Sequence, residues 1–167
     1  EDAEWALVND ESETGLIDWP LGFSADGTIA YLQAEQPEGP DAVVAFDPAT
    51  GERTQVFRDD DTGPMAVIRG ARDVPIGVLL PDGRTRSVFF DPESDDAILV
   101  RSLEKAFEGS TVRVTSRTAD GRLLLVEVSN DRNPGDFYLY DTVAKQASYM
   151  ISRRDWLDPA AMASMRP

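Results

Sequence analysis

Hydrophobic and polar positions along residues 115–152 follow a pattern that predicts four antiparallel strands in chain order. Apolar and aromatic runs at residues 123–128, 137–140 and 147–151 are separated by short segments rich in Asn, Asp, Pro and Gly. Another strand precedes the turn at Ala119-Asp120-Gly121. Aromatic and β-branched runs bounded by such turn residues are typical of β-hairpins. The pattern therefore predicts one four-stranded antiparallel sheet in this part of the chain.

The same order of turns recurs upstream. Ala-Asp-Gly sequences end at Gly27 and Gly121, and each is followed twenty residues later by an aspartate that comes after an aromatic residue, Asp47 or Asp141. A third aromatic–aspartate pair ends at Asp91, so that the three aspartates are 44 and 50 residues apart. A four-stranded unit that repeats every ~40–50 residues has the period of β-propeller blades.

The repeat predicts an all-β fold, a partial β-propeller of about three four-stranded antiparallel blades. We place the blades near residues 21–62, 65–110 and 111–152. The whole of residues 1–167 is then a single fragment of a propeller domain, and residues 153–167 follow its last blade.

Strands of the second blade are expected at residues 66–69, 76–80, 87–90 and 97–100. Two short helices interrupt the β pattern. One is expected near residues 102–107, where apolar residues recur every four positions up to Phe107, and one near residues 158–163. The second has a good start signal, because Asp158 is a favourable N-cap and Pro159 fits the first helical position.

The central strands favour a propeller over a sandwich. Residues 78–80 and 123–126 are continuous apolar runs without alternation. A strand that is apolar at consecutive positions needs cover on both faces of its sheet. Stacked blades provide that cover, whereas each sheet of a β-sandwich is covered on one face only. Three blades do not close a ring, so we expect further blades, or association of fragments, to cover the end faces.

Composition narrows the possible partners. The 167 residues include 16 Lys and Arg against 31 Asp and Glu, a formal net charge of −15, which disfavours nucleic acid and anionic membranes as partners. Hydrophobic residues make up 41% of the chain, enough for a folded core. With no cysteine there is no disulfide framework and no thiolate metal site, and cysteine usage leaves the compartment undetermined.

Catalytic chemistry is largely excluded from this stretch of sequence. Histidine is absent, which removes the usual general base, the serine-protease triad and the commonest metal ligand. There is also no Gly-x-Ser-x-Gly elbow, phosphate-binding loop or dinucleotide fingerprint. We therefore predict no catalytic residue, no metal site and no cofactor within these residues.

Acidic clusters are the remaining candidates for chemistry. Asp91, Glu93, Asp95 and Asp96 are spaced like calcium-loop ligands, but the turn glycine and distal glutamate of that motif are missing. We interpret them as solvated turns, and residues 59–61 as a charged loop between blades in preference to a site for a peptide amino group. A carboxylate pair for glycoside hydrolysis is defined by its separation in space, and sequence cannot select one among 31 acidic residues.

The last blade and the tail resemble the prolyl oligopeptidase family of serine peptidases. The segments that carry the resemblance are residues 107–109, 119–121, 125–131, 133–141, 156–159 and 165–167. In that family they form the final propeller blade and the hinge towards a C-terminal α/β-hydrolase domain. The resemblance is good over residues 100–167 and weaker over residues 21–99, and the two-glutamate amine-binding motif of the dipeptidyl-peptidase branch has no match here.

The resemblance implies a propeller that gates access of short peptides to a catalytic domain and has no activity of its own. The implied partners are further blades and an α/β-hydrolase domain of the parent chain. Contact with that domain is expected at Arg153, Arg154 and Trp156, with a solvated arginine pair as the alternative. Related bacterial enzymes are often exported, which favours the periplasm over the cytoplasm.

Two other classes of function stay open on sequence alone. One is a free-standing propeller of the TolB or WD-repeat kind, which binds proteins through its rim loops. The other is a self-assembling structural repeat.

Overall fold

Three antiparallel sheets make up most of the structure, a computed structural model that describes residues 5–165. Sheet A contains β1 (Asp18–Phe23), β2 (Ala30–Ala34), β3 (Ala42–Phe46) and β4 (Arg53–Arg58). Sheet B contains β5 (Ala66–Arg69), β6 (Pro75–Asp82) and β7 (Arg84–Phe89). Sheet C contains β8 (Thr111–Arg117), β9 (Leu123–Ser129), β10 (Asp136–Asp141) and β11 (Gln146–Ser152). In every sheet, strands that are consecutive in the chain are neighbours.

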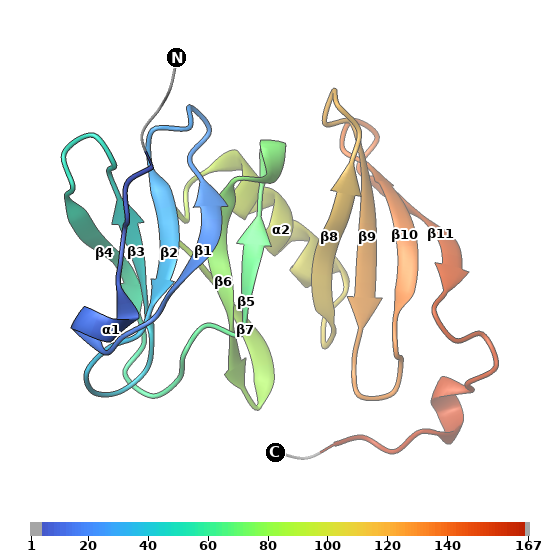
Figure 1. Ribbon diagram of the computed structural model, residues 1–167. Helices are drawn as coiled ribbons and strands as arrows, with labels where there is room; N and C mark the ends of the chain where they lie inside the picture. The colour runs from blue at the N-terminus through green and yellow to red at the C-terminus, as the bar shows by residue number, and fades with distance from the viewer. Residues whose placement is uncertain (1–4, 166–167) are drawn as a thin grey trace.

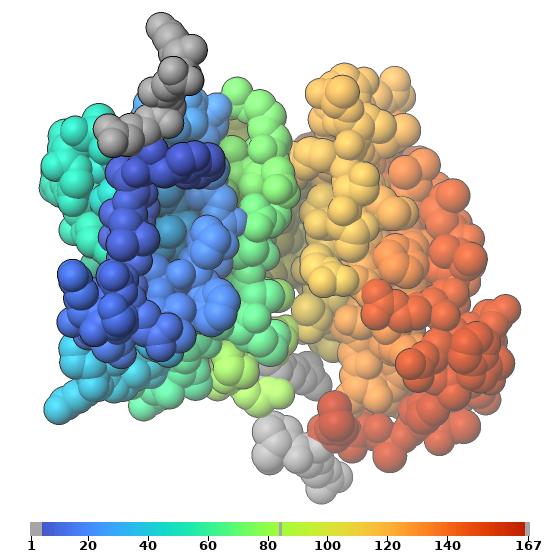
Figure 2. Space-filling view, viewed as in Figure 1, coloured from blue at the N-terminus to red at the C-terminus, as the bar shows by residue number. Residues whose placement is uncertain are grey.

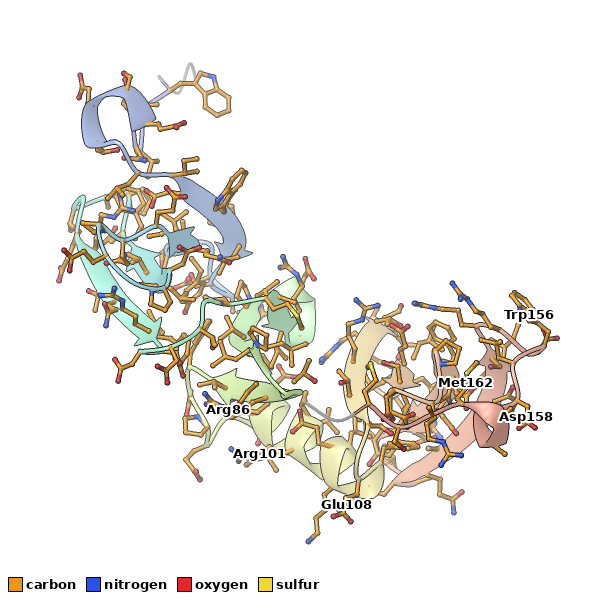
Figure 3. All side chains as sticks on the ribbon, turned by 90° about the horizontal axis from the view of Figure 1, so that it is seen from below. Arg86, Arg101, Glu108, Trp156, Asp158 and Met162 are labelled. Carbon is orange, nitrogen blue, oxygen red and sulfur yellow. The ribbon has the colours of Figure 1, made fainter. Side chains whose placement is uncertain are left out.

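The sheets stand side by side in chain order (Figure 1). Seen from below, they follow a curve, with α2 (Asp95–Ala106) on its convex side between sheets B and C (Figure 3). The other helical segments are α1 (Glu11–Thr14) and the 3-10 turns η1 (Ala71–Asp73) and η2 (Pro159–Ala161). None of the helices within residues 5–165 has the length and apolarity needed to cross a membrane. The predicted β-rich fold is confirmed.

The two Ala-Asp-Gly turns have the same hydrogen bonds, although they lie in different sheets. Asp26 accepts from the Ser24 hydroxyl at 2.6 Å and from the Thr28 N–H at 3.1 Å. Asp120 accepts from the Thr118 hydroxyl and from the N–H two residues further on, also at 3.1 Å. The glycine after each aspartate has a φ of +75° or +71°, which favours glycine. The sequence repeat therefore corresponds to a repeated local structure.

The aspartates of the second repeated turn also act as turn acceptors. Asp47, Asp91 and Asp141 each accept a hydrogen bond from the N–H two residues further along, at 2.8, 3.0 and 2.9 Å. The Asx turns at Asp47 and Asp141 follow the ends of β3 and β10. The Asx turn at Asp91 lies between β7 and α2. The carboxylates at these positions thus fix the chain reversals.

The prediction of a fourth strand in the second blade is wrong. Residues 97–100 belong to α2, so sheet B has three strands, and the helix begins seven residues before the predicted 102–107. Ser94 caps the helix by accepting from the Ala97 N–H at 3.4 Å, and two aspartates occupy the first turn, where the helix dipole favours negative charge. Ala97, Val100 and Leu103 recur three positions apart and are buried on one face. This spacing fits one face of a helix, which explains why residues 97–100 form part of α2 and not the strand predicted from their apolar run.

The C-terminal helix is shorter than expected. The start signal is confirmed, because the Asp158 carboxylate accepts from the Ala160 N–H at 2.9 Å. The segment then forms the single 3-10 turn η2 in place of a helix over residues 158–163. Residues 1–4 of the predicted domain and residues 166–167 of the family resemblance lie outside the described part of the chain.

Two apolar clusters hold the sheets together. Val43 of sheet A packs against Val78 and Leu80 of sheet B, and all three are fully buried. Leu79, on the opposite face of β6, is 8% exposed, so the continuous apolar run of this strand is covered on both faces as predicted. Sheet C is joined differently, because Leu103 of α2 packs into its core.

The core of sheet C depends on the α2 contact. Leu103 is 2% exposed and lies among Val112, Leu124, Val126 and Val128. We expect Leu103→Ala to lower the free energy of unfolding by about 2–5 kcal/mol, because it removes buried methyl groups and leaves a cavity. Ile98→Ala on the same helix, at a site 47% exposed, is the matched control and should change it by about 0.5 kcal/mol or less. Urea titration followed by circular dichroism measures both, and equal losses would contradict this packing.

The Asx turns should make the free energy of unfolding depend on pH between about 4 and 2. The Ser24 hydroxyl lowers the pKa of Asp26 to about 2, and the Thr118 hydroxyl lowers the pKa of Asp120 below its usual value. A depressed pKa in the folded state gives stabilisation that is complete above the unfolded pKa of 3.8 and is lost as the pH falls towards 2.

We therefore expect the double variant Asp26→Asn, Asp120→Asn to be less stable than the parent chain at pH 7, with a smaller further loss between pH 4 and pH 2. The urea midpoint measured across this range tests it. The control is the double variant Asp60→Asn, Asp155→Asn. It also removes two negative charges, but these two carboxylates accept no hydrogen bond from the described residues. If both double variants showed the same pH profile, the turns would have no part in acid sensitivity.

Candidate ligand-binding cleft

A cleft separates the first strands of sheets B and C. β5 and β8 are both edge strands, and their facing sides leave a hollow that is visible between the green and gold surfaces of Figure 2. Its lower part has a volume of about 360 Å³. The apolar residues that line it are Val67, Ile68, Leu79, Val100, Val112 and Val114. Because Val100 comes from α2, the helix contributes to the wall of this cleft.

The upper part of the cleft is polar. It has a volume of about 670 Å³ and lies between the loop after β5, residues 69–73, and the end of β8 with its following turn, residues 114–121. The two parts meet at Arg69, Val114 and Thr115, which line both. The charged residues of the upper part are Arg69, Arg72, Asp73, Arg117 and Asp120. Three arginines thus gather in a chain whose net charge is −15.

The loop after β5 has an unusual backbone. Arg72 and Asp73 have φ values of +55° and +62°, a region that residues other than glycine seldom adopt. The loop is closed by the Gly70 N–H, which donates to the Val74 carbonyl at 2.8 Å. A Cβ at Gly70 would lie 2.7 Å from Ile76 Cγ2 and 2.9 Å from the carboxyl carbon of Asp96, too close for any side chain. Glycine at this position is therefore required by a close approach.

Asp96 joins the two sides of the cleft. From the first turn of α2, its Oδ2 accepts from the Ala71 N–H at 2.7 Å and its Oδ1 pairs with Arg117 Nη1 at 3.0 Å. Arg117 is mostly buried, and its Nη2 has no hydrogen-bond partner among the described residues. A buried cation that loses its only carboxylate is costly, so this link is a structural requirement of the cleft.

The other arginines of the upper part differ in their pairing. Arg69 donates to the Leu21 carbonyl at 2.7 Å, which ties sheet B to sheet A, and pairs with Asp73 at 3.3 Å. Arg72 forms no ion pair with any side chain that the structure describes within 4.0 Å. Of the three arginines of the upper part, Arg72 is therefore the one without an ion pair to a described side chain, and it is exposed.

The residues predicted for interdomain contact lie elsewhere, beyond β11. Arg153 pairs with Glu127, a carboxylate only 5% exposed that Arg113 also contacts, and its guanidinium lies 5.8 Å from the centre of the Phe137 ring. Trp156 is 75% exposed and lies on the side of sheet C away from the cleft (Figure 3). Arg154 is also exposed. A domain contact at Arg153, Arg154 and Trp156 stays a prediction.

The acidic clusters have local structural roles. Of the residues spaced like calcium ligands, Asp91 closes a turn and Asp96 bridges Ala71 and Arg117. Asp59 accepts from two backbone N–H groups and pairs with Arg86 at 2.8 Å. Within residues 5–165, no three acidic side chains gather closely enough to hold a metal ion.

No family model matches the chain, and no curated protein matches it. The resemblance to the prolyl oligopeptidase family therefore depends on the residues quoted in the sequence analysis.

Sequence reasoning missed the cleft. Arg117 lies 45 residues beyond Arg72 in the chain, and the helix that supplies Val100 and Asp96 was predicted in part as a strand. The one available signal was Ser94 followed by two aspartates, a favourable N-cap with acidic residues in the first turn. That signal indicates the start of α2 but says nothing of what its side chains contact.

Removing the Asp96 carboxylate should damage the cleft and the fold together. We expect Asp96→Ala to lower the free energy of unfolding by about 1.5–3 kcal/mol, because charged hydrogen bonds to Arg117 and the Ala71 N–H are lost. The Ala71 amide should also exchange faster with deuterium. Asp95→Ala is the matched control, since Asp95 occupies the same first turn but is exposed. Equal effects of the two variants would show that only charge at the helix start matters.

Proposed function

We propose that the three sheets are consecutive blades of a β-propeller that gates substrate access in a prolyl-oligopeptidase-like serine peptidase. The observation that carries this proposal is the repeated unit. Sheets A and C are both four-stranded meanders in chain order, with equivalent Asx turns at Asp26 and Asp120 and at Asp47 and Asp141. Repeated four-stranded meanders with this period are typical of propellers.

Packing between the sheets supports the same arrangement. Sheet B is buried against sheet A on the Val78 face and turns its Leu79 face towards α2 and sheet C. The first strands β1, β5 and β8 all lie towards the inside of the curve in Figure 3, as the inner strands of blades would. In this arrangement α2 replaces the outer strand of the second blade and fills the space between two blades.

Uncovered apolar surface supports a partner beyond sheet C. Ile151 of β11 lies on the same face of sheet C as Phe137 and is 62% exposed, and Trp156, 75% exposed, follows the strand. Leu125, on the face of β9 opposite α2, is only half-buried, whereas Leu124 is fully buried. We assign this face to further blades and to an α/β-hydrolase domain of the parent protein, the partners that the family resemblance implies.

The proposed role is non-catalytic for these residues. Nucleophile and general base would come from the hydrolase domain, since the sequence has neither a histidine nor a nucleophile elbow. The propeller would exclude folded proteins from that domain and admit short peptides.

The test compares the 167-residue chain with the full polypeptide that contains it. We expect the full polypeptide to hydrolyse short chromogenic peptides and to lose this activity when a serine-directed phosphonate is added or when the serine of its Gly-x-Ser-x-Gly sequence is replaced by alanine. The 167-residue chain alone should show no turnover.

Two outcomes would contradict the proposal. One is turnover by the 167-residue chain that disappears when one of its own residues is replaced. The other is a full polypeptide composed only of further blades, which would favour a free-standing binding propeller. The cleft between β5 and β8 favours this second function, a free-standing binding propeller, because a ligand could bind there without any catalytic domain.

A further inference from the structure

We propose that the cleft between β5 and β8 binds the carboxyl-terminal end of an extended peptide whose last residue is apolar. The lower part of the cleft would take the apolar side chain, and Arg72 would pair with the terminal carboxylate. This binding site stands whether or not the parent protein is a peptidase, and it requires no catalytic step.

The walls of the cleft favour an extended backbone as the ligand. β5 and β8 are each the outermost strand of a sheet, so each has N–H and C=O groups on its open side that no strand of its own sheet satisfies. An extended peptide that pairs with such an edge gains main-chain hydrogen bonds, and pockets for its side chains give specificity. The directions of β5 and β8 are alike, both ending at the polar part of the cleft (Figure 1).

The lower part of the cleft favours an apolar side chain. Ile68, Leu79, Val100, Val112 and Val114 line it, and its volume of about 360 Å³ is sufficient for one aliphatic residue with adjoining backbone. Arg69 and Arg113 also line this part, but each is already paired with a carboxylate, that of Asp73 or Glu127. Val100 is 4% exposed and fixed by α2, so this part of the wall is formed before any ligand enters.

The upper part selects an anion. Arg69 and Arg117 already have carboxylate partners in Asp73 and Asp96. Arg72 has none within the described chain, and the left-handed backbone at residues 72–73 holds it at the rim of the polar part. Arginine is well suited to carboxylates, because its two parallel N–H groups match the two oxygens. Asp73 and Asp120 also line this part, so it is the guanidinium of Arg72, without an ion pair among the described residues, that offers an anion a place to bind.

The polar and apolar parts meet at Arg69, Val114 and Thr115, so one ligand can reach both. Neither part alone identifies the ligand. Together they require an apolar group beside a carboxylate on an extended chain, which is the chemistry of a peptide carboxyl terminus.

The experiment uses two probes, N-acetyl-Ala-Ala-Leu with a free carboxylate and the same peptide as its terminal amide. Both are titrated into the 167-residue chain, with binding followed by backbone ¹H–¹⁵N spectra. We expect the carboxylate peptide to bind about tenfold more tightly than the amide, and the shifted resonances to map to β5, β8 and residues 69–73.

Three variants locate the contacts. Arg72→Ala should reduce the tenfold preference for the carboxylate to less than about twofold, whereas Arg154→Ala, the same charge change beyond sheet C, should leave it unchanged. Val114→Thr keeps the side-chain shape but replaces a methyl group by a hydroxyl where the two parts of the cleft meet, and should weaken both peptides several-fold to a similar extent. The spectrum of each free variant shows whether it is folded.

Equal affinity for carboxylate and amide would overturn the proposal, as would shifts that map to β11 and Trp156. It would also be overturned if neither peptide bound at millimolar concentration, or if Arg154→Ala had the same effect as Arg72→Ala.

Discussion

The central strand of sheet B is apolar on both faces, and the need to cover both faces determines how its neighbours pack. Val78, Leu79 and Leu80 are consecutive and all buried, which a sheet with one wet face would not allow. Sheet A covers one face of sheet B, and α2 with sheet C lies over the other. The side-by-side arrangement of sheets follows from this constraint.

The constraint is met in two different ways, and the difference creates the cleft. Between sheets A and B, side chains interlock directly around Val43, Val78 and Leu80. Between sheets B and C, α2 packs its Leu103 into sheet C and leaves β5 and β8 apart. A helix is wider than a strand, so it separates the sheets that it joins. The cleft is thus a consequence of a helix in the position where the sequence first indicated a fourth strand.

The sequence predicted those parts of the fold that depend on local chemistry. Asx turns at Asp26 and Asp120 are set by residues within a few positions, and the strands between them follow from apolar runs with turn residues at each end. The start of α2 is also local, but the apolar run over residues 97–100 fits a strand as well as one face of a helix. The cleft was beyond prediction, because Asp96 meets Ala71 and Arg117 only after three elements have packed.

Gly70 and Asp96 connect the fold to the proposed site. The close approach of Gly70 lets the loop after β5 reach the first turn of α2, where Asp96 accepts the Ala71 N–H. The same carboxylate neutralises Arg117 on β8, so Arg117 is not the arginine that receives a ligand. Since Arg69 is likewise paired with Asp73, the arrangement that stabilises the two walls leaves Arg72 at the rim without an ion pair among the described residues. Structural pairing and ligand recognition are therefore divided among arginines that lie within one loop and the strand opposite it.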